Sequence, residues 1–182
     1  MSDEGFIAWC SPTLAGIKVA NLFNCDSPSS SEITNDIRSY NRRLSSSGVV
    51  VIPVKQMNGK TLIYVYRPKL LRAYLAQESV RSILTDFGYD ADDMNACILR
   101  MISRLNENEF PHEIGLFLGF PPEDVKGFIE NKGRNYKVCG MWKVYGDVCK
   151  CSSLFDKYEM CTRTLLDQYR SGNTVERLTA VV

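Results

Sequence analysis

The chain has 182 residues, of which 45% are hydrophobic and 24% are charged, and its net charge is +1 at pH 7. This length and balance are typical of a folded chain with a buried core and exclude a wholly disordered protein. No apolar run approaches the ~18 residues of a membrane-spanning helix, and residues 1–4 lack the basic and apolar segments of a signal peptide. We therefore expect a cytoplasmic protein without a membrane partner.

The first third of the chain predicts two helices. Ser11-Pro12 is typical of a helix start, and apolar residues near helical spacing extend the first helix over residues 12–23. Ser29-x-x-Glu32 fits a capping box at the start of the second helix. One apolar stripe defines that helix: Ile33, Ile37, Tyr40 and Leu44. Gly48 is suited to a left-handed cap at its end.

The next segment changes from helical to strand-like composition. Runs of β-branched and aromatic residues flank Asn58-Gly59, and both turn residues tolerate a positive φ. A β-hairpin over residues 49–67 is therefore predicted, with Pro53 indicating an edge strand or a bulge. Because two strands alone are marginally stable, the hairpin needs a third strand or a helix layer, and residues 136–145 are the candidate for that strand.

The remaining segments predict helices joined by short connections. They cover residues 68–76, 78–87, 92–106, 111–119, 122–131 and 147–170, with a last turn at 174–180. No strand–helix–strand alternation, internal repeat or long linker interrupts them. We predict a single α+β domain over residues 1–182, mostly helical, with a small antiparallel sheet.

Residues 112–129 match the pattern of a helix-turn-helix. Gly115 is small where two helices would cross, and Gly119 suits the turn between them. The second helix would begin with Glu123 and Asp124, whose carboxylates would repel DNA phosphates. A structural helical hairpin is therefore favoured over a DNA-binding one.

The seven cysteines indicate reduced thiols. They include no Cys-x-x-Cys pair, and His112 is the only histidine, so neither a disulfide framework nor a metal site is predicted. Cys10 precedes the expected helix start, where the dipole would lower its pKa; a small buried residue is the alternative. His112-Glu113 offers proton transfer, with a helix-capping role as the alternative.

Charge is distributed unevenly along the chain. Residues 38–77 hold eight basic residues and no acid, whereas residues 78–109 hold seven acids and three bases. This asymmetry indicates either an anion-binding face or two faces that complement each other within the fold, and the second is favoured. Arg67, at a strand end before Pro68, is a candidate for binding an anion or an ordinary surface arginine.

Five blocks of sequence resemble a known family. They are residues 11–23 (SPTLAGIKVANLF), 64–68 (YVYRP), 110–119 (FPHEIGLFLG), 128–133 (FIENKG) and 142–146 (WKVYG). Over nearly its whole length the chain thus resembles the bacterial family catalogued as domain of unknown function 3793. The resemblance implies no activity, cofactor or substrate, but the blocks hold most of the candidate polar residues.

The leading hypothesis is a small-molecule binding protein or enzyme for an anionic ligand, with a site of Lys or Arg plus one His. The candidate catalytic residues are His112, Glu113 and Cys10. The candidate ligand-binding residues are Thr13, Lys18, Asn21, Arg67, Asn131 and Lys143. The alternative is a non-enzymatic module that binds protein or nucleic acid through the basic 38–77 face or the 112–129 hairpin. The residues identify no cofactor and no oligomeric state.

Overall fold

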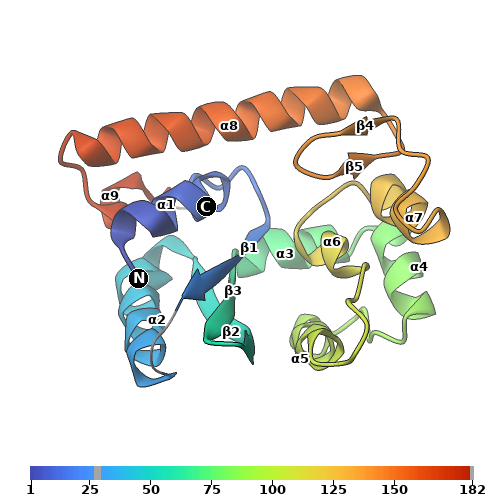
Figure 1. The fold of residues 1–182 in the computed structure, drawn as a ribbon, viewed down its shortest axis with the longest axis horizontal. Coiled ribbons are helices and arrows are strands. Elements are labelled where there is room, and N and C mark those ends of the chain that lie inside the picture. Colours follow the sequence, from blue (N-terminus) through green and yellow to red (C-terminus); the bar gives the residue numbers. More distant parts are fainter. Residues whose placement is uncertain (27–29, 181–182) are drawn as a thin grey trace. The chain divides into compact units, whose positions relative to one another are not determined.

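The computed structural model describes residues 1–26 and 30–180, and it contains two separate units (Figure 1). Unit 1 combines Met1–Leu70 with Tyr158–Val182, and unit 2 is the intervening Leu71–Lys157. The predicted class is confirmed, because helices predominate and the largest sheet has three antiparallel strands. The assignment of residues 1–182 to one domain stays a prediction.

The three-stranded sheet lies in unit 1. Its strands are β1 (Ala20–Asp26), β2 (Val50–Met57) and β3 (Lys60–Tyr66), in the order β1-β3-β2. Both pairings are antiparallel, and Tyr66 of β3 lies opposite Ala20 of β1. Figure 1 shows α1 and α2 beside this sheet.

The predicted hairpin is confirmed in its turn and in its irregularity. Asn58 and Gly59 both have positive φ values, 52° and 73°, as a two-residue hairpin turn requires. The register between β2 and β3 shifts between Pro53 and Lys55. Because β2 is also an edge strand, Pro53 occupies the kind of position that tolerates a residue without an N–H group.

Two predictions about the first segment are wrong. The first helix, α1, spans Asp3–Leu14 rather than residues 12–23, and Ser2 caps it by accepting a hydrogen bond from Gly5 N. Pro12 lies in its last turn and not in its first. The chain then turns at Gly16, whose φ is 73°, and enters β1.

The third strand of the sheet is therefore β1, and not the segment near 136–145. That segment instead forms β4 (Val138–Cys139) and β5 (Lys143–Val144), a separate two-stranded sheet in unit 2. The hairpin needed a partner strand, as expected, but took it from a segment preceding it in the chain.

Helices from both ends of the chain complete unit 1. They are α2 (Ser30–Leu44), the short 3-10 helix η1 (Ser45–Ser47), the second half of α8 (Val148–Arg170) and α9 (Val175–Leu178). The predicted stripe on α2 is buried in a core with Phe6, Phe23 and Val65. Gly48 has the predicted left-handed conformation, whereas Ser29 of the capping box lies outside the described residues.

The helices of unit 2 follow the predicted order. They are α3 (Pro68–Leu75, which begins in unit 1), α4 (Glu78–Asp86), α5 (Met94–Leu105), α6 (Ile114–Phe117), α7 (Pro122–Glu130) and the first part of α8. The helix predicted over residues 111–119 is only the four residues of α6. Among the described residues, no helix is both long and apolar enough to cross a membrane.

Helices α6 and α7 form the predicted helical hairpin. A Cβ atom on Gly115 would lie 2.8 Å from a methyl group of Val125 and 3.1 Å from the ring of Phe120. Only glycine therefore fits where the two helices meet. Gly119 turns the chain between them with a φ of 73°.

Asp124, near the start of α7, is buried, and so its carboxylate does not face outward to repel DNA phosphates as predicted. Its buried carboxylate accepts hydrogen bonds from the amides of Tyr145 (2.7 Å) and Gly146 (2.8 Å) and from the Trp142 indole (2.8 Å). The thiol of Cys151 also donates to it, at 3.3 Å. Burial opposes ionisation of this group, but the hydrogen bonds outweigh burial and lower its pKa.

We expect Asp124→Asn to lower the free energy of unfolding by about 2–4 kcal/mol. The amide that replaces one carboxylate oxygen is itself a donor, and it would face other donors with no acceptor between them. Urea denaturation followed by circular dichroism measures the loss. Asp156→Asn makes the same change on an exposed residue and should leave stability within about 0.5 kcal/mol; equal losses in both variants would contradict this role of Asp124.

Candidate functional site

Arg67 is buried and bound to backbone carbonyl groups. Only 1% of its side chain is exposed. Its guanidinium donates to the carbonyls of Thr13 (2.5 Å), Leu14 (2.5 Å), Ser47 (2.8 Å) and Ala180 (2.8 Å). The prediction of a surface arginine is wrong, and four of the five N–H groups that would hold an anion are already used within unit 1.

Other predicted residues of unit 1 gather near the same end of α1. Thr13 Oγ1 donates to Asn21 Oδ1 at 2.6 Å. Lys18 Nζ donates to the carbonyl of Ala20, and only 6% of the residue is exposed. These polar groups satisfy one another inside the fold, so their convergence stabilises the junction between α1 and β1.

Cys10 lies within α1 and not before its start. Burial therefore raises the pKa of its thiol, and the interpretation of Cys10 as a cysteine activated by a helix N-terminus is wrong. Burial has the opposite effect on the neighbouring amine and lowers the pKa of Lys18 to about 7, against a smaller opposing effect of Cys10.

Glu113 and His112 have separate environments in unit 2. Glu113 is 1% exposed and accepts hydrogen bonds from Arg104 Nε (2.9 Å) and from the hydroxyl of Tyr89 (3.1 Å). His112 is exposed, and its ring centroid lies 4.8 Å from that of Phe128. The two residues proposed as an acid–base pair therefore have different partners: Glu113 is in a buried ion pair with Arg104, and His112 is in an exposed contact with Phe128.

Lys143 lies close to the ring that His112 contacts, and Asn131 follows the end of α7, the helix that carries this ring. Lys143 Nζ donates to the carbonyl of Gly133 at 2.8 Å and lies 5.7 Å from the centroid of Phe128. Asn131 Nδ2 donates to the carbonyl of Gly127 at 2.8 Å. The structure therefore brings three predicted residues of unit 2 to the neighbourhood of α7, whereas Cys10, Thr13, Lys18, Asn21 and Arg67 belong to unit 1.

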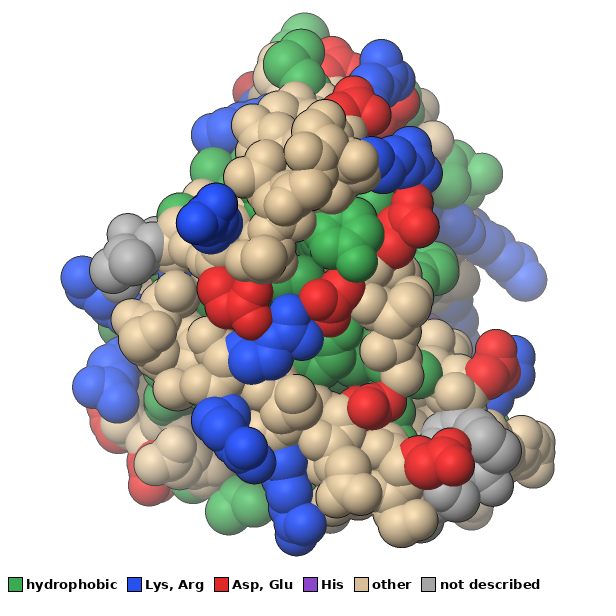
Figure 2. All heavy atoms as spheres, turned by 90° about the vertical axis from the view of Figure 1, so that its left-hand side faces the viewer, with side chains coloured by type: hydrophobic (Ala, Val, Ile, Leu, Met, Phe, Trp, Pro, Cys, Tyr) green, Lys and Arg blue, Asp and Glu red, His purple; other side chains and the backbone are tan. Residues whose placement is uncertain are grey.

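Two cations of the basic stretch 38–77 form ion pairs within unit 1. Arg43 forms ion pairs with Asp3 (2.7 Å) and with Glu176, and Lys60 pairs with Asp26 at 3.4 Å. Figure 2 shows basic and acidic side chains next to one another on this part of unit 1. The favoured interpretation, that this stretch and the acidic residues 78–109 complement each other, stays a prediction, because the acids paired with Arg43 and Lys60 lie outside residues 78–109. Four cations have no hydrogen-bond or ion-pair partner among the described residues: Arg38, Arg42, Lys69 and Arg72.

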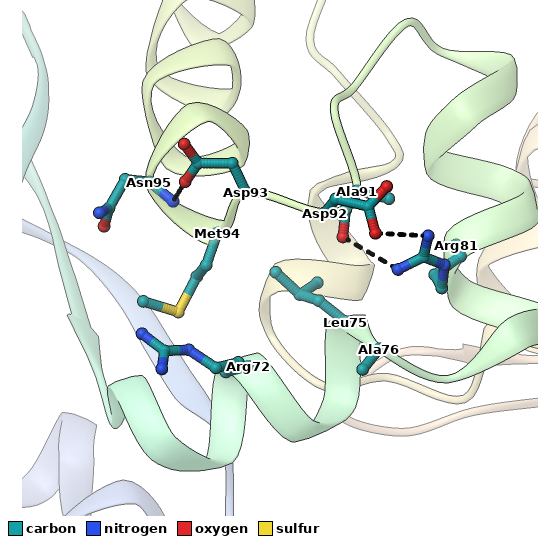
Figure 3. A pocket seen from close by; sticks show the side chains of 9 residues that line it. All are labelled: Arg72, Leu75, Ala76, Arg81, Ala91, Asp92, Asp93, Met94 and Asn95. Carbon is teal, nitrogen blue, oxygen red and sulfur yellow. Dashed lines mark hydrogen bonds and ion pairs between the residues drawn. The ribbon is translucent and has the colours of Figure 1, made fainter.

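One of these four cations lines a pocket in unit 2. The pocket has a volume of about 500 Å³ and lies between α3, the start of α5 and the chain that joins α4 to α5. We call it the α3–α5 pocket. Figure 3 shows Arg72 extending from α3 below Met94, with Leu75 between Arg72 and the paired side chains of Arg81 and Asp92.

The other charged groups of the α3–α5 pocket are already engaged. Arg81 Nη2 donates to Asp92 Oδ1 at 2.7 Å, and its Nη1 lies 3.4 Å from the carbonyl of Ala91. Asp93 caps α5 by accepting hydrogen bonds from the amides of Asn95 and Ala96. Arg72 is thus the one lining cation without a partner among the described residues.

The sequence placed Arg72 in the basic stretch but did not single it out. The spacing of apolar residues in this segment indicates that Arg72 lies on the exposed side of α3. It does not indicate that α5 begins opposite Arg72. Among residues 1–26 and 30–180, no group of three His, Cys, Asp or Glu side chains is arranged to hold a metal ion.

Comparison with known proteins identifies a family for the chain. A family model described as "Protein of unknown function (DUF3793)" covers residues 6–179, nearly the whole chain. No curated protein and no solved structure is similar to the chain.

We expect Arg67→Met to destabilise unit 1 by about 3–5 kcal/mol, because it removes four hydrogen bonds to carbonyl groups, of which those of Thr13 and Leu14 each keep a backbone N–H donor. The free energy of unfolding of Arg67→Lys should lie between those of Arg67→Met and the wild type, since an ammonium group reaches fewer of the four carbonyl oxygens. Urea denaturation measures both. Arg38→Met, on an exposed residue without a partner, is the control, and a loss as small as the control's would contradict this role of Arg67.

Lys18 should make stability depend on pH. The unfolded chain keeps the Lys18 proton up to about pH 10.5, whereas the folded chain releases it near pH 7. The unfolded state therefore binds more protons between these values, and this group's contribution to the free energy of unfolding rises by up to ~1.4 kcal/mol per pH unit.

The test compares wild type with Lys18→Met by urea denaturation in a reducing buffer from pH 6 to 8.5. The change with pH of the difference in free energy of unfolding between the two proteins is the quantity to measure. A constant effect of the substitution does not alter this change, and the contributions of the other titrating groups cancel in the difference. The stability of the variant relative to wild type should fall as the pH rises above about 7. A difference that stays constant over this range would show that the folded chain keeps the Lys18 proton.

Proposed function

We propose a function for this chain, which belongs to the family of proteins of unknown function DUF3793, from the geometry of its α3–α5 pocket. Unit 2 binds a small molecule that carries one carboxylate group, and Arg72 is the anchor for that group. The single observation that carries this proposal is a guanidinium that lines a pocket of about 500 Å³ and has no partner among the described residues. This size is ordinary for a small-molecule site.

The planar guanidinium of Arg72 suits a carboxylate. It presents paired N–H groups in the geometry of two carboxylate oxygens, and such bidentate pairs are stronger than neutral hydrogen bonds. The guanidinium needs no rearrangement of an existing ion pair to accept a ligand, because it has no partner among the described residues. Arg81, by contrast, would have to leave Asp92 first.

The charge of the lining favours a ligand with one negative charge. Two carboxylates, Asp92 and Asp93, share the pocket with Arg72 and Arg81, so the lining as a whole has no net charge. A phosphate monoester or a dicarboxylate would bring a second negative charge that no free cation balances. Repulsion by the two aspartates would therefore select against it.

The rest of the lining favours an apolar ligand body. Leu75, Ala76, Ala91 and Met94 contribute aliphatic surface, which a short hydrocarbon chain would cover. The lining contains neither histidine nor cysteine, and His112 belongs to another part of unit 2. We therefore propose that the pocket binds this ligand, and we assign no reaction to it. The predicted site of Lys or Arg plus one His is replaced by a site of Arg72 and aliphatic side chains.

The test is an NMR titration of ¹⁵N-labelled protein with butyrate and hexanoate, with inorganic phosphate and succinate for comparison. The monocarboxylates should shift the amide signals of Ala91 and Asn95 saturably, and the two dianions should not. Arg72→Gln should weaken butyrate binding about 10- to 100-fold, the effect of losing a charged hydrogen bond.

Arg38→Gln is the matched control, because it removes an exposed, unpartnered arginine from α2. It should bind butyrate as tightly as wild type does. Retention of butyrate binding by Arg72→Gln, or tighter binding of phosphate than of butyrate, would overturn the proposal.

A further inference from the structure

Four aromatic side chains follow one another across the surface of unit 2, outside the α3–α5 pocket. The ring centroids of Phe110 and His112 are 6.0 Å apart, and those of His112 and Phe128 are 4.8 Å apart. Lys143 Nζ then lies 5.7 Å from the centroid of Phe128 and 4.8 Å from that of Tyr136. We call these four rings, joined through Lys143, the aromatic row.

Part of the aromatic row is accessible to a partner. Phe110 is 56% exposed and Tyr136 is 43% exposed, and His112 is also exposed. Soluble proteins bury most of their large rings, so a series of exposed rings in contact indicates a surface that a partner covers. The bond from Lys143 to the Gly133 carbonyl holds the loop with Tyr136 beside Phe128.

The segment around the aromatic row is strongly basic. Residues 126–143 contain five basic residues and one acid, and that acid, Glu130, lies 3.8 Å from Lys126. Lys132 and Arg134 are exposed and have no partner among the described residues. Two other acids lie near the row in the chain: Glu109, which precedes Phe110, and Glu113, which follows His112 and is paired with Arg104.

The two free cations lie next to the rings. They flank Gly133, whose added Cβ would be 3.1 Å from the ring of Phe128. The backbone that carries Lys132 and Arg134 therefore passes directly against the middle of the aromatic row. Exposed rings and unpaired cations thus form one continuous surface on unit 2.

We propose that this surface binds single-stranded nucleic acid, with bases stacked on the exposed rings and phosphates held by Lys132 and Arg134. A single strand offers flat bases and a negative charge at every step, and proteins bind it by stacking and cationic contacts. Spacings of 4.8–6.0 Å between neighbouring rings are within the reach of successive bases that have separated from their stack. This site is independent of the α3–α5 pocket and extends the function beyond it.

A duplex fits this surface less well than a single strand does. The bases of a duplex are stacked on one another, so they have no free faces for Phe110 or Tyr136. Helix α7 would bring Glu123 and Asp124 first to a groove, and Asp124 is committed to internal hydrogen bonds. The arrangement therefore favours stacking on open bases over reading of a groove.

The test is fluorescence anisotropy with a labelled 12-nucleotide oligo(U) RNA and the matching oligo(dT), and with a 12-base-pair duplex, at several salt concentrations. Wild-type protein should bind the single strands more tightly than the duplex, and its affinity should fall with salt. Tyr136→Ala should weaken binding about 5-fold or more through lost stacking, with an unchanged salt slope.

The double variant Lys132→Ala/Arg134→Ala should change the salt dependence itself. Removing two phosphate contacts should lower the slope of log affinity against log salt by about 1.4 for a single strand. Arg38→Ala/Arg42→Ala removes the same charge from exposed, unpartnered residues of α2 and should keep the wild-type slope. Circular dichroism confirms that each variant folds.

Three results would overturn the proposal. The first is the absence of salt-sensitive binding to either single strand. The second is an equal loss in the α2 control, which would mean that affinity follows net charge alone. The third is displacement of the RNA by poly-aspartate at the same charge concentration, which would assign the surface to an acidic protein. Arg72→Gln should bind oligo(U) like wild type, so that this test and the carboxylate test fail separately.

Discussion

The buried guanidinium of Arg67 is the interaction on which unit 1 depends. Arg67 is the residue that directly follows β3. Its guanidinium donates to carbonyls at the end of α1, in η1 and at Ala180, three segments that are far apart in the chain. The last carbonyls of a helix lack partners within it, and a cation is favourable there. One side chain thus satisfies the end of α1 and holds the C-terminal segment to the sheet.

Unit 2 depends on a buried charge of the opposite sign. Asp124 accepts hydrogen bonds from two amides, an indole and a thiol, as Arg67 donates to four carbonyls. A buried charge is stable only when such groups surround it. These two buried charges therefore serve the fold, and the two proposed binding sites rest instead on Arg72, Lys132 and Arg134, three of the cations without a partner among the described residues.

Local patterns predicted most of the fold, because their causes are local. The stripe on α2, the Asn58-Gly59 turn and the small Gly115 each depend on neighbours within a few residues. The position of α1 was wrong because Ser11-Pro12 was interpreted as a helix start, whereas the helix begins after the Ser2 cap and contains Pro12 in its last turn, at the expense of one i→i−4 hydrogen bond. Strand β1 was missed because β3, its partner, follows 34 residues later (Ala20–Asp26 against Lys60–Tyr66). For the site, the sequence shows how many cations there are but not which groups they contact. Neither the burial of Arg67 nor the lack of a partner for Arg72 among the described residues was therefore predictable.

The division of unit 1 between the two ends of the chain has a consequence for synthesis on the ribosome. All of Leu71–Lys157 leaves the ribosome before Tyr158 and the residues after it, and chains are made at ~5–20 residues per second. Unit 2 can therefore pack first, while the N-terminal part of unit 1 waits for α9 and for the carbonyl that Ala180 presents to Arg67. During that interval the guanidinium and the apolar surface of α1 are exposed to solvent and to chaperones.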